Sequence, residues 1–383
     1  MSAGRLTELD FDVGGLARIR LTDAEPGDVG RVAHQLGIEP TEPSGEADLT
    51  VRFAARLELP GPLRLVGAGD AGYAGDVFIV LARGTPRAMV PLDEVGRAAT
   101  IVVRRGVGVP HLVPILNLSL LGKGILPLHA SAFSYRGRGI AAAAWSKGGK
   151  TEALLAFMAA GADLVADEWT YIAPDGRMSG FRSPIRLLAW HLRQQPELRR
   201  RVGREEWLRL AALDGAAAVA QRLTGVRVPA ARAGAARLAT RLASMGHVDV
   251  RPADLFGPGR CSHAGQLNEM LLLVRRDAPG IEVRPIPGHT VAERMLFAHL
   301  HHRLDLIGRY WQFRYAFPER QTDLLDQLET LERGLLRHAL ADRPAWLVEH
   351  PGRVDLQRLF EAIAAAPGRV SDAVGETDEG AVR

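Results

Sequence analysis

The stretch that decides the fold runs from residue 129 to residue 168 and reads HASAFSYRGRGIAAAAWSKGGKTEALLAFMAAGADLVADE. Apolar and aromatic residues at 128–135 and 139–145 predict two strands joined by a glycine-containing turn. Residues 151–161 carry apolar side chains at helical spacing and end on a glycine, which predicts a helix. Residues 162–173 predict the next strand. A strand, a glycine-rich loop, a helix and a strand, in that order, are typical of a phosphate-binding loop.

The loop itself is Ala144-Trp145-Ser146-Lys147-Gly148-Gly149-Lys150-Thr151, which matches the pattern G-x-x-x-x-G-K-[ST] except at its first position. The two glycines let successive backbone N–H groups point at phosphate oxygens. A lysine at the seventh position reaches the β- and γ-phosphates, and the hydroxyl after it ligates Mg²⁺. Alanine at the first position requires a negative φ. We therefore predict ATP·Mg²⁺ as cofactor, bound by these residues: Ser146, Lys147, Gly148, Gly149, Lys150 and Thr151.

Lysine usage supports this interpretation independently of the motif. The chain has only three lysines, Lys123, Lys147 and Lys150, and all its other basic side chains apart from histidine are arginine. Lysine offers a compact point charge, whereas arginine offers a wide planar fork. Two of the three lysines fall in the loop, which indicates that a small ammonium group is needed there.

Two acids and one histidine flank the loop in sequence. Asp167 and Glu168 come at the predicted end of the strand after the helix, where an acid can hold Mg²⁺ or accept a proton from an attacking hydroxyl. The metal ligands predicted here are therefore Thr151, Asp167 and Glu168. His129 begins the strand before the loop; a lone histidine is more often a core or surface residue than a catalytic one.

The segment 129–171 resembles the HPr kinase/phosphorylase family and its kinase-like relatives, which share a fold core with phosphoenolpyruvate carboxykinase. Those proteins carry a histidine that opens a strand, the loop G-x-S-G-x-G-K-S followed by Glu, a helix ending in Gly, and then L-V-A-D-D. The family's spacing is kept from His129 to the loop and again from Lys150 to Asp167. These residues fall on the motif: Ser146, Gly149, Lys150, Thr151, Glu152 and Asp167. The resemblance therefore adds Glu152 to the predicted nucleotide-binding residues.

The resemblance implies a kinase that moves the γ-phosphate of ATP to a hydroxyl of a peptide, protein or small-molecule acceptor. It implies that Asp167 activates the hydroxyl as a base, that Lys150 contacts the transferred phosphate and that His129 helps near it. The catalytic residues predicted are thus Asp167, His129 and Lys150. The identity of the acceptor is not readable from the sequence.

Departures from the family pattern keep a second interpretation open. Ala144 and Lys147 stand where the motif has glycines, and Glu168 stands where it has a second Asp. A later E-x-R-G-x-G-type segment, which engages the protein substrate in that family, has no counterpart, so HPr itself is not the expected acceptor. The alternative is a nucleotide-binding regulatory or scaffold protein with little or no transfer. A further candidate, nucleotide hydrolysis coupled to movement, needs a separate acid at the end of a later strand, and the sequence shows none.

Around the loop, the sequence predicts a two-part α/β protein. Residues 1–118 contain three β-branched runs and one segment of helical spacing at 28–38, which predicts a small N-terminal α+β domain. Residues 119–366 predict an HPr-kinase/phosphoenolpyruvate-carboxykinase-like P-loop domain, with an Arg/Ala-rich helical insertion at 182–245. The polar tail 367–383 predicts disorder.

The later part of the P-loop domain yields coarser predictions. Residues 267–277 and 281–286 predict a pair of strands; two helical segments, a strand at 345–350 and a last helix follow. Thirteen Arg against four acids lie between residues 182 and 241. Three arginines are candidates for clamping a phosphate or an acidic acceptor: Arg182, Arg186 and Arg275.

Composition excludes several classes. A single cysteine, Cys261, excludes an internal disulfide and fits a reducing cytoplasm. The start of the sequence has no apolar signal segment, and the longest apolar run, 112–121, is too short to span a membrane. A net charge of +4 is too small to indicate a nucleic-acid partner. We predict a cytoplasmic protein without a membrane span, and leave a homo-oligomer open.

Two further patterns give only weak support for a site. His299 and His302 have the spacing of a metal pair on a helix, but no acid or cysteine motif accompanies them. Cys261 and His263 are two residues apart in a Gly/Pro-rich loop, which is weak support for a nucleophile pair.

Overall fold

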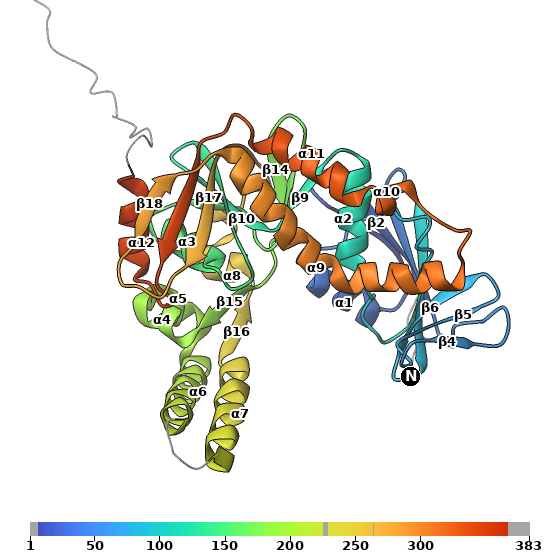
Figure 1. The fold of residues 1–383 in the computed structure, drawn as a ribbon, viewed down its shortest axis with the longest axis horizontal. Helices are drawn as coiled ribbons and strands as arrows, with labels where there is room; N and C mark the ends of the chain where they lie inside the picture. Colours follow the sequence, from blue (N-terminus) through green and yellow to red (C-terminus); the bar gives the residue numbers. More distant parts are fainter. Residues whose placement is uncertain (1–6, 225–228, 263, 367–383) are drawn as a thin grey trace, which may run out of the picture.

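The computed structural model describes residues 7–224, 229–262 and 264–366. The described chain is a mixed α/β protein with two large sheets and a small two-stranded one. Figure 1 shows two lobes, one built on each large sheet, with a long helix running from one to the other. None of the helices within these residues has both the length and the apolar character needed to cross a membrane. The predicted tail 367–383 lies outside the described residues.

The first lobe is built on an eight-stranded sheet in the order β1-β2-β3-β8-β7-β6-β5-β4. The strands are β1 (Thr7–Asp12), β2 (Arg18–Ala24), β3 (Leu49–Ala54), β4 (Arg64–Val66), β5 (Ala71–Ala74), β6 (Val77–Ala82), β7 (Thr85–Met89) and β8 (Ala99–Arg104). Helix α1 (Pro26–Leu36) connects β2 to the parallel strand β3, and Gly37 ends it in the left-handed conformation. The three β-branched runs correspond to β3, β6 and β8, and the helical spacing corresponds to α1.

Two of these strands, β4 and β5, have no clear sequence signal. Strand β5 reads AGYA and β4 is three residues long, so neither offers an alternation of apolar and polar residues that a pattern could detect. They form because β6 supplies an edge with which they pair in turn, β6 with β5 and β5 with β4. Tertiary pairing, rather than local propensity, determines these elements.

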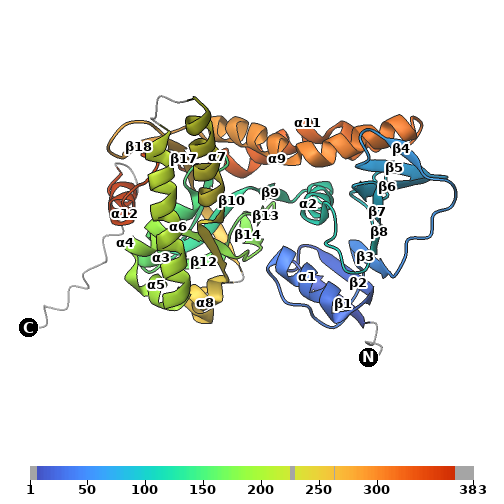
Figure 2. The same ribbon diagram turned by 90° about the horizontal axis from the view of Figure 1, so that it is seen from below.

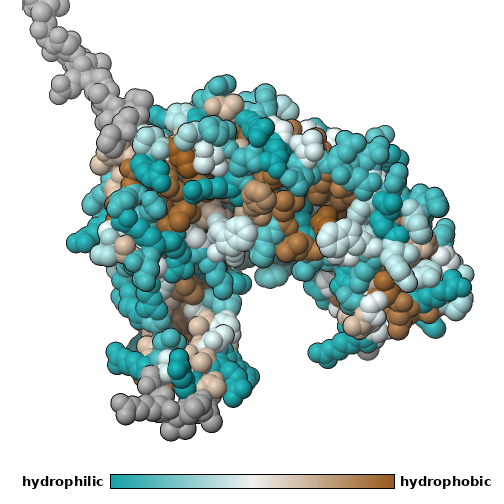
Figure 3. Space-filling view, viewed as in Figure 1, coloured by the Kyte–Doolittle hydropathy of each residue, from teal (hydrophilic) through white to brown (hydrophobic). Residues whose placement is uncertain are grey.

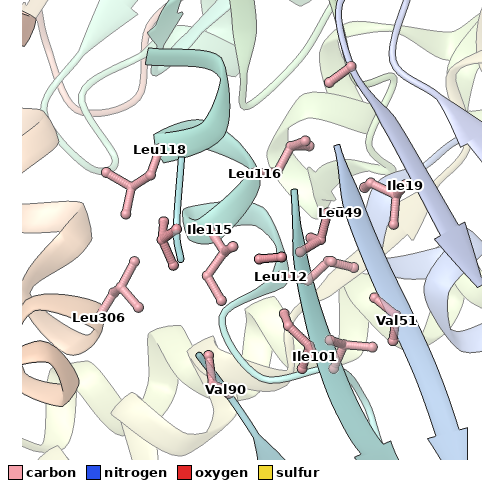
Figure 4. Close-up of a cluster of buried hydrophobic side chains, with 14 of the residues drawn as sticks. Ile19, Leu49, Val51, Val90, Ile101, Leu112, Ile115, Leu116, Leu118 and Leu306 are labelled. Atoms are coloured by element: carbon pink, nitrogen blue, oxygen red, sulfur yellow. The ribbon is translucent and has the colours of Figure 1, made fainter. Parts of the chain in front are cut away.

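The core of the first lobe extends beyond its own segment of sequence. Helix α2 (Leu112–Gly122) packs Leu112, Ile115 and Leu116 against the sheet, and Leu306 from a distant helix closes the other side of α2 (Figure 4). That helix is α9 (Gly288–Ala316), whose second half buries Tyr310 and Phe313 in the same core. The first lobe is therefore completed by residues from the C-terminal third of the chain.

The second lobe contains a nine-stranded mixed sheet in the order β12-β10-β11-β17-β14-β13-β9, with β19 and β18 branching from β17. Its strands are β9 (Leu126–Leu128), β10 (Ala130–Tyr135), β11 (Arg138–Ala144), β12 (Asp163–Ala166), β13 (Thr170–Ile172), β14 (Arg177–Gly180), β17 (Gly265–Arg275), β18 (Glu282–Pro285) and β19 (Ala345–His350). Helices α3 (Lys150–Ala159) and α12 (Leu356–Ala364) share one hydrophobic cluster with this sheet. A second cluster joins the sheet to α9 and α11 (Leu328–Leu340), and a short α10 (Asp323–Asp326) lies between those two helices in sequence.

Three sequence predictions need correction here. The strand expected at 162–173 is two strands, β12 and β13, which pair with β10 and β9 and are separated at residues 167–169, where Glu168 takes a positive φ of 66°. The strand expected at 128–135 is interrupted at His129. Strands β17 and β18 do not pair with each other: β19 lies between them, parallel to β17 and antiparallel to β18.

Most of the described part of the segment predicted as a helical insertion, 182–245, is helical, but residues 185–188 form a strand, and only its last two helices project as an arm. Helices α6 (Arg204–Leu223) and α7 (Pro229–Met245) run side by side away from the second lobe (Figures 1 and 2). The arm is rooted on the antiparallel pair β15 (Ile185–Leu188) and β16 (His247–Val250). The base of the arm also contains α4 (Ala189–Gln194), α5 (Pro196–Val202), α8 (Pro252–Phe256) and a 3-10 turn at Pro258–Arg260.

Candidate functional site

The glycine loop joins the end of β11 to the start of α3, as the sequence predicts. Ala144 is not among the residues with positive φ, so alanine is tolerated where the motif has glycine. Gly149 has a φ of 117°, and a Cβ there would lie 2.2 Å from Nε2 of His350. A Cβ on Gly148 would lie 2.7 Å from Cβ of Ala144. Both loop glycines are therefore required by close packing, and Gly149 by its backbone conformation as well.

Lys150 opens helix α3 with its side chain turned into the protein. Its ammonium contacts Nε2 of His129 and lies 3.6 Å from Oε2 of Glu168. Burial lowers the pKa of Lys150, while the carboxylates of Glu168 and Asp167 oppose that shift. The lysine that the motif assigns to the phosphates is thus enclosed by a histidine and an acid in the described structure.

Asp167 and Glu168 follow β12 at the same edge of the sheet as the loop. Asp167 is buried and accepts a hydrogen bond from Oγ of Ser131 at 2.5 Å. Burial, with the neighbouring Glu168 carboxylate, raises the pKa of Asp167 to about 6. The hydrogen bond with His129 is the main reason that the pKa of Glu168 is lowered to about 2. Two adjacent carboxylates in different environments therefore have pKa values far apart.

His129 lies in the gap between β9 and β10, beside both Lys150 and Glu168. Its Nε2 is 3.0 Å from Oε2 of Glu168 and also contacts the Lys150 ammonium. One ring nitrogen can donate to the acid or accept from the ammonium, but not both at once. Burial lowers the pKa of His129 to about 3, so the ring is neutral near pH 7. Its Nδ1 is buried without a hydrogen-bond partner among the described residues.

A second layer of polar side chains supports His129 from α9 and α11. The backbone N–H of His129 donates to Nε2 of His299 at 3.0 Å, and the other ring nitrogen of His299 lies 2.9 Å from Oε1 of Glu332. Because Nε2 accepts, Nδ1 carries the proton and donates to the carboxylate. Arg303 pairs with the same carboxylate, and all three side chains are buried. His302 packs its ring 3.8 Å from the His129 ring, centroid to centroid.

The sequence did not indicate this second layer. Residues 299–303 read HLHHR on one helix, which suggested at most a metal pair. Glu332 lies on another helix, and its approach to His299 is created by the packing of α11 against α9. Since both nitrogens of His299 are engaged by protein groups, His299 is not available as a metal ligand.

The remaining predicted loop residues have distinct surroundings. Glu152 is partly buried and lies 3.7 Å from Nε2 of His191. Burial raises the pKa of Glu152, but the interactions with His191 outweigh it, and the net shift is downward. Ser146 and Lys147 are exposed on the outer side of the loop, where Lys147 takes a positive φ of 61°. Thr151 is half-buried at the start of α3.

Of the three candidate arginines, Arg182 forms an isolated backbone bridge with Asp167, and the Glu168 charge is among the causes of the raised pKa of Arg186. Arg186 forms a two-pronged pair with Asp249 across β15 and β16, at 2.9 and 3.1 Å. Arg275 donates to the backbone carbonyls of Lys147 and Gly352 and so holds the outer side of the loop. Arg182 lines a separate cavity between the two lobes, next to the buried Cys261. His263, the proposed companion of Cys261, lies outside the described residues.

Within the described residues, no group of three or more His, Cys, Asp or Glu side chains is arranged to hold a metal ion by itself. Mg²⁺ bound with a nucleotide takes most of its ligands from phosphates and water, so this arrangement requires few protein ligands. The donors present suit it: the Asp167 and Glu168 carboxylates are adjacent, and the Glu168 charge helps to raise the pKa of Asp167. A divalent cation would relieve that repulsion.

Comparison with known proteins adds no relative: no family model matches this chain, and no curated protein matches it.

Proposed function

We propose that this chain is an ATP-dependent phosphotransferase that moves the γ-phosphate to a hydroxyl of a peptide, protein or small molecule. The observation that carries the proposal is the convergence of Lys150, His129, Asp167 and Glu168 beside the two glycines of the loop. A lysine, two acids and a glycine loop at the start of a helix are the parts that phosphoryl transfer requires.

In the proposed reaction, the backbone N–H groups of the loop and the Lys150 ammonium bind the β- and γ-phosphates. Asp167 accepts the proton of the acceptor hydroxyl as its oxygen bonds to the γ-phosphorus, and the bond to the β-phosphate oxygen breaks to release ADP. A pKa of about 6 suits a base working near neutral pH. Thr151, Asp167 and Glu168 would hold Mg²⁺, which neutralises charge on the phosphates.

The lysine must first change partners. A phosphate that reaches Lys150 has to compete with Glu168, which lies 3.6 Å from the ammonium. Displacing the Glu168 carboxylate would free it for Mg²⁺ and would leave His129 facing the transferred phosphate. Nδ1 of His129 is buried without a hydrogen-bond partner in the part of the chain that the structure describes, so rearranging the network breaks no hydrogen bond at that nitrogen.

The same observation supports the second candidate, a nucleotide-binding regulatory protein without transfer. There the contact of Lys150 with Glu168 and His129 would serve as the nucleotide-free state of a switch, and nucleotide would exchange one arrangement for the other. For either candidate we propose a cytoplasmic location, on the ground of the single cysteine.

The test is transfer of γ-labelled phosphate from ATP·Mg²⁺ into fractionated host extract, with nucleotide affinity measured in parallel. Wild type, Asp167→Asn and Lys150→Ala are compared. The kinase proposal expects label in a discrete species, abolished by Asp167→Asn although that variant still binds ATP. Binding without transfer in any fraction would favour the regulatory candidate. Absence of nucleotide binding by the wild type would overturn both.

A further inference from the structure

A cavity of about 570 Å³ opens on the outer side of the loop. Its walls are the loop residues 145–148, the end of β17 and the first half of α9. Trp145 and Phe297 contribute two aromatic side chains that are 52% and 57% exposed. Apolar side chains gather along α9 in the middle of the face seen in Figure 3. The cavity lies beside the catalytic residues and includes none of them.

The charged side chains that line this cavity are all cationic among the described residues. Lys147, Arg275 and Arg294 lie in it, and no Asp or Glu is among its described lining residues. The rest of the lining is mostly aliphatic, from β17 and α9. An apolar cavity bordered by cations fits a ligand with a flat apolar body attached to an anionic group.

The order of the strands indicates the direction in which a bound nucleotide would run. The acids follow β12, and β10 separates β12 from the loop strand β11; β17 lies on the opposite side of β11. In the proposed reaction the γ-phosphate must lie beside Lys150 and Asp167. The other end of the triphosphate, which carries the nucleoside, then leads away from the acids toward β17. The cavity lies on that side.

One of the two aromatic side chains, Trp145, is held in place by a stacked ring. The Trp145 ring stacks on the ring of His301 from α9, with centroids 4.9 Å apart and planes 25° apart. Trp145 belongs to the loop itself, so a group that packs against its ring lies next to the backbone proposed to bind phosphate. Phe297 lies one helical turn before His301 and contributes to the same wall.

We propose that this cavity binds the nucleoside of a nucleoside triphosphate, with the base packed on Phe297 and Trp145. Lys147 and Arg294 are then the cations nearest to the sugar and the α-phosphate. The inference rests on the proposed nucleotide-binding function and names the part of the nucleotide that the motif leaves unassigned. Stacking, rather than a polar side chain that reads base edges, provides the contact, so ATP and GTP should bind within a few-fold of each other.

The experiment compares ATP·Mg²⁺, GTP·Mg²⁺ and inorganic tripolyphosphate·Mg²⁺ by titration calorimetry on the full chain. We expect wild type to bind both nucleotides more tightly than tripolyphosphate. Phe297→Ala should weaken ATP binding by roughly 5- to 150-fold, the range for one stacked base, and leave tripolyphosphate binding unchanged. Trp311→Ala is the matched control: Trp311 is 65% exposed on the same helix but does not line the cavity.

The outcomes separate this inference from the function on which it rests. If ATP and tripolyphosphate bind equally, or if Phe297→Ala weakens both by the same factor, the base does not occupy the cavity and the inference is overturned, while the phosphate site stands. An equal effect of Trp311→Ala would also overturn it. If wild type binds neither ligand, the proposed function fails and takes the inference with it.

Discussion

At the residue scale, Asp167 is a buried carboxyl whose ionisation lowers stability and whose ionised form is the base in the proposed reaction. Burial and the Glu168 charge raise its pKa to about 6, above the ordinary value of 3.8, so the folded protein favours the protonated form. The stability that this group contributes is fully present below about pH 3.8 and is lost as the pH rises through about 6. Above that pH the buried carboxylate lowers the stability of the fold. The carboxylate is also the form of Asp167 that acts as the base in the proposed reaction.

The first prediction follows from that sign. Asp167→Asn keeps an oxygen that can accept from Ser131 but removes the charge. We expect it to raise the free energy of unfolding by about 1–3 kcal/mol at pH 8 and to change it little at pH 4. Urea titrations of both proteins at the two pH values measure this. A variant that is less stable than wild type at pH 8 would show that the Asp167 charge is well compensated in the fold.

The second prediction concerns Gly149. An alanine there would have a φ of 117° and a Cβ 2.2 Å from the His350 ring. We expect Gly149→Ala to lower the free energy of unfolding by at least about 2 kcal/mol and to abolish nucleotide binding, because the loop must move to relieve the contact.

Gly161 provides the matched control for that variant. Its φ is 99°, but nothing lies within 4 Å of a Cβ built there. Gly161→Ala should therefore cost only the backbone strain, about 1–2 kcal/mol, and leave nucleotide binding intact. Equal losses of stability in the two variants would mean that the His350 contact contributes nothing.

At the element scale, α9 and α11 determine the position of His129 through a buried network. Although burial raises it, the interactions with His299 and Arg303 bring the pKa of Glu332 down to about 2. Arg303, His299 and Glu332 are each at most 1% exposed. Buried charges of this kind are stable only as a complete set, because removing one partner leaves the others unpaired.

The third prediction is that Glu332→Gln lowers the free energy of unfolding by about 3–5 kcal/mol at pH 7. Because the folded pKa is depressed, the stability from Glu332 is present above its ordinary value of 4.5 and is lost as the pH falls through about 2. The difference between the two proteins should therefore shrink below pH 4.5, as measured by chemical denaturation. Glu329→Gln, which removes only an exposed pair with Arg333 on the same helix, should change stability by less than about 1 kcal/mol.

The elements also show how far the sequence can be interpreted. The loop, α3 and the two strands around it were predictable, because glycine, helical spacing and apolar runs are local signals. Lys150 and Asp167 were predicted as site residues by motif and spacing, and they lie together in the structure. Glu332 was not, because its approach to His299 depends on two helices packing together. The interruption between β12 and β13 was also missed, since a positive φ at Glu168 has no sequence signature.

At the scale of the whole molecule, the two lobes share α9. Its first half covers the sheet that holds the loop, and its second half completes the core of the first lobe with Leu306, Tyr310 and Phe313. Ion pairs add to the joint: Arg309 of α9 pairs with Asp70, and Arg320, which follows α9, pairs with Asp93 at 2.8 Å. The boundary expected near residue 118 therefore separates two sheets but does not separate two complete cores.

The last prediction follows from this shared helix. A fragment of residues 1–124 lacks α9, α10 and α11, so it would expose the apolar surface of α2 and the sheet that Leu306, Phe313 and Leu328 cover. Burying three such side chains is worth roughly 1.5–3 kcal/mol each, a large share of the stability of a small domain. We expect the fragment to lack a cooperative melting transition in calorimetry, and the full chain to unfold the two lobes together. A fragment that melts cooperatively at the temperature of the full chain would show that the first lobe is an independent domain and that α9 merely rests on it.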